Sequence, residues 1–227
     1  MYIDSISKRF DLDIFHNITF KFMKGKYYAI FGKNGSGKTT LLNIMNGNIK
    51  QDSGDSDFDK YKVVFIRNNS IPFPYMSAMD FIIQTCNLKS IKWNKSKIIE
   101  LVDEFGLSGR EHELLITYSK GMQYKILLII ALLSDVDILL LDEPFSELDF
   151  ITMNKMKNLF DVYLNKVTII FSCHSIEIAS KVADEFLFLS SRELKTIASK
   201  EDFENIKKLE ESLINEMNNG GNINGKI

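Results

Sequence analysis

The amino-acid sequence predicts an α/β fold with a mostly parallel sheet, an N-terminal antiparallel β part and an inserted helical sub-domain. Three observations lead to this prediction. A glycine-rich loop stands between a strand-like run and a helix-like run near the N-terminus. Short apolar runs typical of buried strands occur on both sides of residues 71–133, whereas that stretch shows only helical spacing. The chain of 227 residues is also long enough to bury one sizeable core.

Residues 1–31 predict antiparallel strands, because short apolar stretches alternate there with turns. Lys24-Gly25 predicts a hairpin turn that leads into the strand under the glycine-rich loop. The Phe10 ring stands among polar neighbours and either stacks on a nucleotide base or belongs to the core; the sequence favours neither. His16 lies in a strand-like pattern, so we expect it to be structural rather than catalytic.

The glycine-rich loop, GKNGSGKTT at 32–40, matches G-x-x-x-x-G-K-[ST], a pattern whose backbone N–H groups surround nucleotide phosphates. We expect Lys38 to contact the outer phosphates and the Thr39 hydroxyl to bind Mg²⁺. YYAIF before the loop predicts a buried strand, and TTLLNIMNG after it predicts a helix whose N-terminus faces the anion. The core is therefore predicted to be that of a P-loop NTPase. The expected ATP-binding residues of the loop are Gly32, Lys33, Asn34, Gly35, Ser36, Gly37, Lys38, Thr39 and Thr40.

A second buried strand is predicted in KVVFIRNN, residues 62–69, after a polar stretch at 47–60 that predicts a surface loop or hairpin. The strand ends in Arg67, Asn68 and Asn69. Ligand contacts collect at this end of the strands in open α/β sheets, so these polar residues are candidates for the nucleotide site.

Residues 71–133 predict a helical sub-domain, with helical spacing over 78–88, 97–105 and 122–133. The apolar segment 71–79 is either a docking surface for a partner or part of the sub-domain core. We expect one ATP-binding domain over residues 1–200, with its core at 1–70 and 134–200 and the sub-domain at 71–133. We also expect a C-terminal helix and a flexible tail over 201–227. The tail is predicted because the end of the chain is rich in glycine and asparagine.

The core resumes at DILLLDEP, residues 137–144, whose four consecutive apolar residues predict a strand buried on both faces. Asp142 at its end is placed to hold Mg²⁺ across from Thr39, and Glu143 is the candidate to polarise an attacking water. Further buried strands are predicted at 167–172 and, as the last strand, at 185–191, with a helix at 152–165. His174 lies just past the end of the first of these strands, so we expect it to be functional.

Composition excludes several classes of protein. The net charge of -2 provides no basic excess, so no nucleic-acid partner is expected. The N-terminus lacks the apolar core of a secretory signal, and the longest apolar run, 126–133, is too short to cross a bilayer. We therefore expect a cytoplasmic protein with two ordinary thiols, Cys86 and Cys173.

These residues, in this order, resemble the ATP-binding subunit of an ABC transporter. YSKGMQ at 118–123 resembles the family signature LSGGQ, and SELD at 146–149 resembles the loop after the catalytic acid. His174 resembles the family's switch histidine, and Phe10 falls where an adenine-stacking aromatic is expected. The likeness covers nearly the whole chain.

The resemblance implies an ATPase in which two subunits, identical or different, sandwich two ATP molecules and drive a separate transmembrane permease from the inner face of the cell membrane. Ser119 and Gly121 would contact the ATP of the opposite subunit. Glu143 would orient the water, His174 would contact the γ-phosphate, and Asp149 would link the two sites.

Three positions depart from the family pattern: Lys120 and Met122 in the signature, and Asn68 where a glutamine commonly helps bind Mg²⁺ and water. Our hypothesis is that turnover is intact but slow. The transported substrate is not predicted. Alternatives are an ABC-type ATPase switch in DNA repair or on the ribosome, although the long coiled coils and tandem cassettes typical of such relatives are missing from the sequence.

Overall fold

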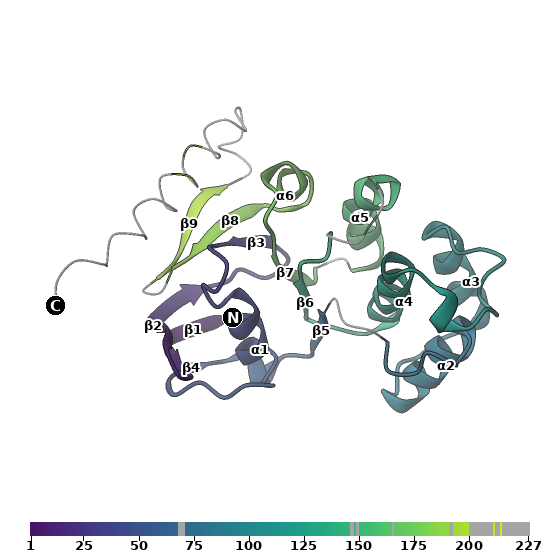
Figure 1. The fold of residues 1–227 in the computed structure, drawn as a ribbon, viewed down its shortest axis with the longest axis horizontal. Helices are drawn as coiled ribbons and strands as arrows, with labels where there is room; N and C mark the ends of the chain where they lie inside the picture. Colours follow the sequence, from purple (N-terminus) through teal and green to yellow (C-terminus); the bar gives the residue numbers. More distant parts are fainter. Residues whose placement is uncertain are drawn as a thin grey trace. The chain divides into compact units, whose positions relative to one another are not determined.

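The computed structural model describes residues 1–67, 71–145, 148, 150–164, 166–190, 193–199, 211 and 214, with side chains omitted at 150, 151, 153 and 154. Two compact units make up the structure (Figure 1). The first unit is drawn from Met1–Phe65, Asp137–Glu143 and the chain from Lys166 onward, and the second from Ile66–Val136 and Pro144–Asn165. The predicted domain boundaries stay a prediction.

An antiparallel sheet of three strands opens the first unit, in the order β2-β1-β4. Its strands are β1 (Tyr2–Arg9), β2 (Asp13–Lys21) and β4 (Ser53–Ser56). The predicted N-terminal antiparallel part is therefore confirmed. The polar stretch after the loop helix forms β4, which pairs antiparallel with β1.

The second sheet of this unit has six strands in the order β5-β6-β7-β3-β8-β9. Strands β6, β7, β3 and β8 pair in parallel, and only β9 is shown to run antiparallel, against β8. The mostly parallel sheet predicted from the sequence is confirmed. The strands are β5 (Val63–Arg67), β6 (Ile138–Asp142), β7 (Thr168–Ser172), β3 (Tyr27–Phe31), β8 (Glu185–Leu189) and β9 (Leu194–Ser199).

Two details of the predicted strands were wrong. The turn at Lys24-Gly25 does not close a hairpin, because β2 and β3 belong to different sheets. The Gly25 N–H donates a hydrogen bond to the Thr168 hydroxyl at 2.9 Å, which anchors the turn on β7 instead. The strand at 185–189 is also not the last, since β9 follows it and pairs with it at the edge of the sheet.

Helix α1 (Lys38–Met45) is central to the core of the first unit. Its apolar side chains belong to one buried cluster that includes residues of both sheets. Leu41 and Leu42 are fully buried in this cluster, together with Phe15 of β2 and Leu140 of β6. The start of α1, and the loop before it, is thereby fixed over the parallel sheet. The unit also holds the short helices η1 (Phe58–Lys60) and α6 (Ile176–Val182).

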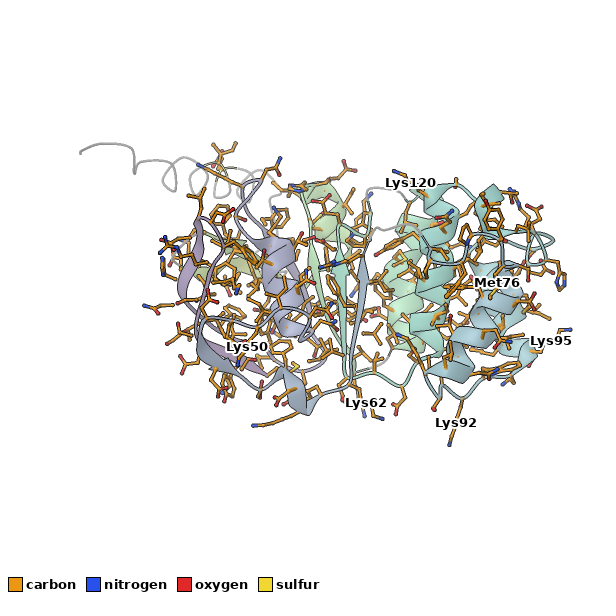
Figure 2. The ribbon with its side chains drawn as sticks, turned by 60° about the horizontal axis from the view of Figure 1, so that its bottom comes forward. Lys50, Lys62, Met76, Lys92, Lys95 and Lys120 are labelled. Atoms are coloured by element: carbon orange, nitrogen blue, oxygen red, sulfur yellow. The ribbon has the colours of Figure 1, made fainter. Side chains whose placement is uncertain are left out.

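The second unit is helical, as predicted for the inserted sub-domain. Helix α4 packs against α2, α3 and α5. Buried residues occur around most of α4, from Tyr124 to Leu132, and not on one face alone. This is the pattern of a helix at the centre of its unit. Its first residue, Lys120, is exposed (Figure 2). The helices are α2 (Ala78–Leu88), α3 (Lys95–Glu104), η2 (Leu115–Thr117), α4 (Lys120–Leu133) and α5 (Phe150–Tyr163).

Among the described residues, no helix combines the length and the apolar character needed to cross a membrane.

Candidate nucleotide-binding site

The glycine-rich loop joins the fully buried strand β3 to helix α1. Its shape depends on glycine at two positions. Gly37 is the N-cap of α1 with φ +94°, and a Cβ there would lie 2.4 Å from Cγ2 of Ile14. A Cβ on Gly32 would lie 2.5 Å from the Ser36 hydroxyl oxygen and 2.7 Å from the Leu189 carbonyl oxygen. The loop backbone therefore passes so close to surrounding residues that only glycine fits at these two positions. This tight turn lets the backbone N–H groups of the loop converge on a phosphate.

The Lys38 ammonium lies inside this loop. Its side chain is buried, and Nζ donates hydrogen bonds to the carbonyl oxygens of Gly32 (2.9 Å) and Lys33 (3.3 Å). Burial lowers the pKa of Lys38, and the nearby charges of Glu143 and Asp142 partly oppose this shift. Two acidic side chains therefore stabilise a buried positive charge at the centre of the loop.

The Ser36 hydroxyl oxygen is buried and has no hydrogen-bond partner within the described part of the chain. A buried polar group normally has a partner, so this oxygen fits a bound phosphate better than an empty turn. The predicted phosphate loop thus combines an unsatisfied hydroxyl, a positive charge and a helix N-terminus.

Asp142 lies at the carboxyl end of β6, next to the start of α1. The Thr39 hydroxyl is 3.1 Å from Oδ1 and 2.9 Å from Oδ2 of Asp142, to which it donates. Hydroxyl and carboxylate oxygens are the ligands that Mg²⁺ prefers, and this ion usually takes only one or two protein ligands beside substrate phosphates. The described residues contain no cluster of three or more His, Cys, Asp or Glu side chains that could hold a metal ion. The Thr39 and Asp142 pair fits Mg²⁺.

Glu143 and His174 come together at the ends of β6 and β7. Nε2 of His174 lies 2.7 Å from Oε1 of Glu143. An ionised carboxylate can only accept, so the imidazole N–H is the donor of this hydrogen bond. Both side chains are 46% exposed, so the Glu143 carboxylate is accessible to solvent. This is the geometry expected of a group that orients a water molecule.

A hollow of about 420 Å³ opens over the loop, and it is lined by Ile14, Asn34, Gly35, Gly37, Lys38, Thr39, Thr40 and Glu143. Ile14 was not predicted as a site residue, because its apolar side chain looks like any other in a strand.

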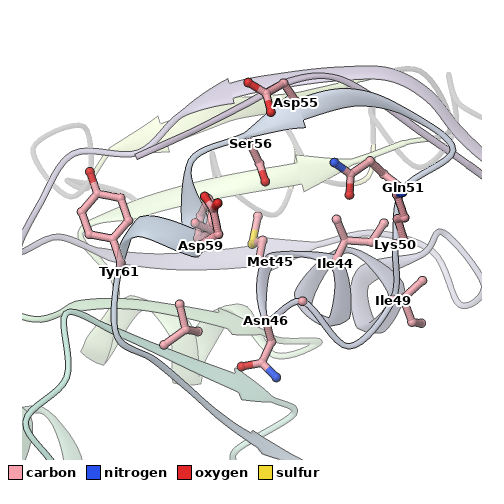
Figure 3. Close-up of a pocket in the computed structure, with 13 residues that line it drawn as sticks. Ile44, Met45, Asn46, Ile49, Lys50, Gln51, Asp55, Ser56, Asp59 and Tyr61 are labelled. Carbon is pink, nitrogen blue, oxygen red and sulfur yellow. The ribbon is translucent and has the colours of Figure 1, made fainter.

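A larger hollow of about 630 Å³ lies at the other end of α1 (Figure 3). There the side chain of Met45 points toward Ser56 of β4. No residue of the glycine-rich loop lines this second hollow, so its size does not make it the phosphate site.

The remaining predicted residues fall into three groups. Phe10 is 53% exposed, so it does not belong to the core, and Lys8 Nζ lies 5.1 Å from its ring centroid. His16 is also exposed and pairs with Asp13 at 3.2 Å, which agrees with a structural role. Asn68 and Asp149, as well as Ser146, lie outside the described residues.

Ser119 and Gly121 lie at the N-terminus of α4 in the second unit. Ser119 is the N-cap, and its hydroxyl oxygen accepts a hydrogen bond from the Met122 N–H at 3.2 Å. Ser119 is exposed and Gly121 is half-buried in the first turn. The signature-like segment therefore presents the N–H groups of a helix N-terminus, which favours contact with an anion.

Comparisons with known proteins place these observations in a family. Residues 15–146 match a protein family described as ABC transporter. The chain is also 31% identical over 207 residues to "Aliphatic sulfonates import ATP-binding protein SsuB" of Bacillus cereus, covering 84% of this chain and 81% of that protein. The chain belongs to the ABC transporter family. "Taurine import ATP-binding protein TauB" of Ruegeria pomeroyi is 28% identical, with 84% of this chain and 77% of that protein covered.

Solved structures agree on the fold of this ABC transporter subunit. "Structure of ATP binding subunit of ABC transporter" superposes with a TM-score of 0.79 at 19% identity, covering 94% of this chain and 98% of that one. A dimeric post-hydrolysis state of an ATP-binding cassette bound to ADP and Pi superposes at 0.72, with 20% identity and coverage of 87% and 99%. The predicted fold class is confirmed. So is the predicted function of an ATP-hydrolysing subunit that powers transport.

Proposed function

We propose that this subunit binds Mg²⁺·ATP at the glycine-rich loop and hydrolyses it with the side chains at the ends of β6 and β7. The observation that carries the proposal is the convergence of Lys38, Thr39, Asp142 and Glu143 within one unit. The loop N–H groups and Lys38 hold the phosphates. Thr39 and Asp142 hold Mg²⁺, which supplies positive charge to the phosphate oxygens when bound.

Glu143 and His174 act on the reacting atoms. Glu143 accepts a hydrogen bond from the water that attacks the γ-phosphorus, and His174 contacts the γ-phosphate. Glu143 lines the hollow over the loop, and its contact with His174 at 2.7 Å fixes one carboxylate oxygen, so little rearrangement is needed when a water binds. The exposed Phe10 ring is the proposed stacking surface for adenine.

A second ATP-binding subunit completes the site. We assign Ser119 and Gly121, at the N-terminus of α4, to the γ-phosphate of the ATP that the opposite subunit holds. The support is that Ser119 is exposed and caps the N-terminus of α4, the end of a helix that favours an anion. Because each phosphate is then neutralised from both sides, ATP itself stabilises the dimer.

The permease is proposed to bind an exposed apolar patch of the second unit. This patch consists of Phe73, Tyr75, Leu114 and Ile116, which are 55%, 76%, 43% and 50% exposed. The two segments are held side by side, because the Ile116 N–H donates to the Pro74 carbonyl oxygen at 2.7 Å. In contrast, Ile71 and Met79 are buried, so segment 71–79 is core at its ends and apolar surface in its middle. Such a contact would hold the subunit against the inner face of the membrane.

The Glu143→Gln variant tests the proposal. We expect it to bind Mg²⁺·ATP as the wild type does, to lose hydrolysis by a factor of about 10² or more, and to sediment as a dimer when saturated with Mg²⁺·ATP. The wild type should turn over slowly but measurably. A wild-type rate that cannot be told from that of the variant contradicts the assignment of Glu143, and a strictly monomeric variant contradicts the shared site.

A further inference from the structure

Ser172 is the last residue of β7 and is fully buried, with no solvent exposure. It ends a strand whose five residues are all buried and whose middle three are apolar. A hydroxyl in such a place needs hydrogen-bond partners, since burying it without them is unfavourable. Its partners lie in the nucleotide site. Ser172 Oγ donates to Oδ1 of Asp142 at 2.8 Å and accepts from the Glu143 N–H at 2.8 Å.

The register of the sheet explains this meeting. Strands β6 and β7 are parallel, and Leu141 pairs with Phe171. The next residue on each strand is Asp142 and Ser172, respectively, so the two side chains leave the sheet on the same face as neighbours. A hydroxyl is the smallest side-chain group that can donate to one neighbour and accept from another at once. An aliphatic residue, which the buried pattern would favour, can do neither.

Each hydrogen bond of Ser172 fixes the conformation of one acidic residue in the nucleotide site. Glu143 has φ +50°, a left-handed backbone conformation that residues other than glycine rarely adopt. The hydrogen bond from its N–H to Ser172 stabilises this conformation, which directs the Glu143 side chain to His174. The bond to Oδ1 fixes the rotation of the Asp142 carboxylate, so that Oδ2 lies 2.9 Å from the Thr39 hydroxyl.

We propose that Ser172 is a positioning residue for ATP hydrolysis: one buried hydroxyl sets both the metal-binding carboxylate of Asp142 and the backbone that aims Glu143 at the water. This inference rests on the proposed roles of those two side chains. Ser172 does not touch the nucleotide. It acts through its neighbours, as outer partners of metal ligands do.

The test compares Ser172→Thr with Ser172→Val, because threonine and valine have nearly the same shape and differ in the hydroxyl. We expect Ser172→Val to lower kcat about tenfold to a hundredfold with a smaller change in KM. Ser172→Thr should stay within a few-fold of the wild type. A second readout does not need turnover: the affinity for a fluorescent ATP analogue, measured with Mg²⁺ and with EDTA. Ser172→Val should lose much of the gain in affinity that Mg²⁺ provides, and Ser172→Thr should keep it.

Thr168→Val is the matched control on the same strand. The Thr168 hydroxyl is also buried, but it accepts from the Gly25 N–H at the other end of β7. This variant should lower the unfolding temperature and leave both kcat and the effect of Mg²⁺ unchanged. If a valine at 172 prevents folding, Ser172→Ala removes the hydroxyl without adding volume and should show the same losses.

Two results would overturn the inference. Either Ser172→Val and Ser172→Ala match the wild type in both readouts, or Ser172→Thr loses as much as Ser172→Val while Ser172→Ala keeps wild-type values, which would make volume the cause. Failure of the proposed function is a separate result, because it appears as wild-type hydrolysis in Glu143→Gln and Asp142→Asn.

Discussion

The substitution Gly37→Ala tests whether the shape of the loop is set by contact with the antiparallel sheet. The φ angle of Gly37 is +94°, which strains any other residue by about 1–3 kcal/mol. A Cβ would also lie 2.4 Å from Ile14 Cγ2 and 2.9 Å from Phe15 Cδ1. Phe15 is fully buried and cannot move aside, so this overpacking adds about 1–3 kcal/mol. The sum is roughly 4 kcal/mol, and for a chain of this length it lowers Tm by roughly 10 °C.

Gly47→Ala is the matched control, measured in the same thermal unfolding experiment by circular dichroism. Gly47 follows the other end of α1 with φ +73°, and a Cβ there would meet nothing within 4 Å. Only the backbone strain remains, about 1–2 kcal/mol, so its Tm should fall by roughly 3 to 5 °C. Equal losses in the two variants would refute the reasoning, because the crowding by Ile14 and Phe15 would then contribute nothing.

Two further predictions concern the thiols and the apolar patch. Burial raises the pKa of the Cys173 thiol to about 11, so the reactive thiolate is scarce at pH 8, and labelling of the native protein by iodoacetamide should be slow. Its rate should rise as the pH approaches 11, and both cysteines should react at once in denaturant; fast labelling of Cys173 at pH 8 contradicts this. The double variant Phe73→Ser, Tyr75→Ser changes exposed side chains only, so its Tm and its ATPase rate without the permease should match the wild type, while co-purification with a co-expressed permease is lost. Retained co-purification would show that the patch is not the docking surface.

Local patterns in the sequence were enough for the elements of the site that are close in the chain. The loop at 32–40, with a buried strand before it and a helix after it, is a short-range arrangement of glycines, lysine and threonine. The same holds for the apolar run that ends in Asp142 and Glu143. Parallel strands bring their carboxyl ends to one edge, so His174 could also be placed near them.

Pairing between distant segments could not be predicted in the same way. The turn at Lys24-Gly25 looks like a hairpin, yet its N–H bonds to Thr168, which lies 143 positions away in the chain. Ile14 and Phe10 are both apolar residues near the N-terminus, and only the packing shows that the first lines the hollow and the second is exposed. The role of Ser172 could not be predicted from the sequence, because it depends on hydrogen bonds to Asp142 and Glu143 that only the structure shows.

The sequence by itself determined that this protein is an ABC-type ATPase with a phosphate loop, an acidic pair and a histidine, because the chemistry of phosphate binding requires particular residues at fixed short spacings. The tertiary structure decided which residues support that chemistry from a distance. It gave the direct contacts between Asp142 and Thr39 and between Glu143 and His174, and it placed Ser172 against both acidic residues. The register of neighbouring strands depends on how the whole core packs and not on any local spacing.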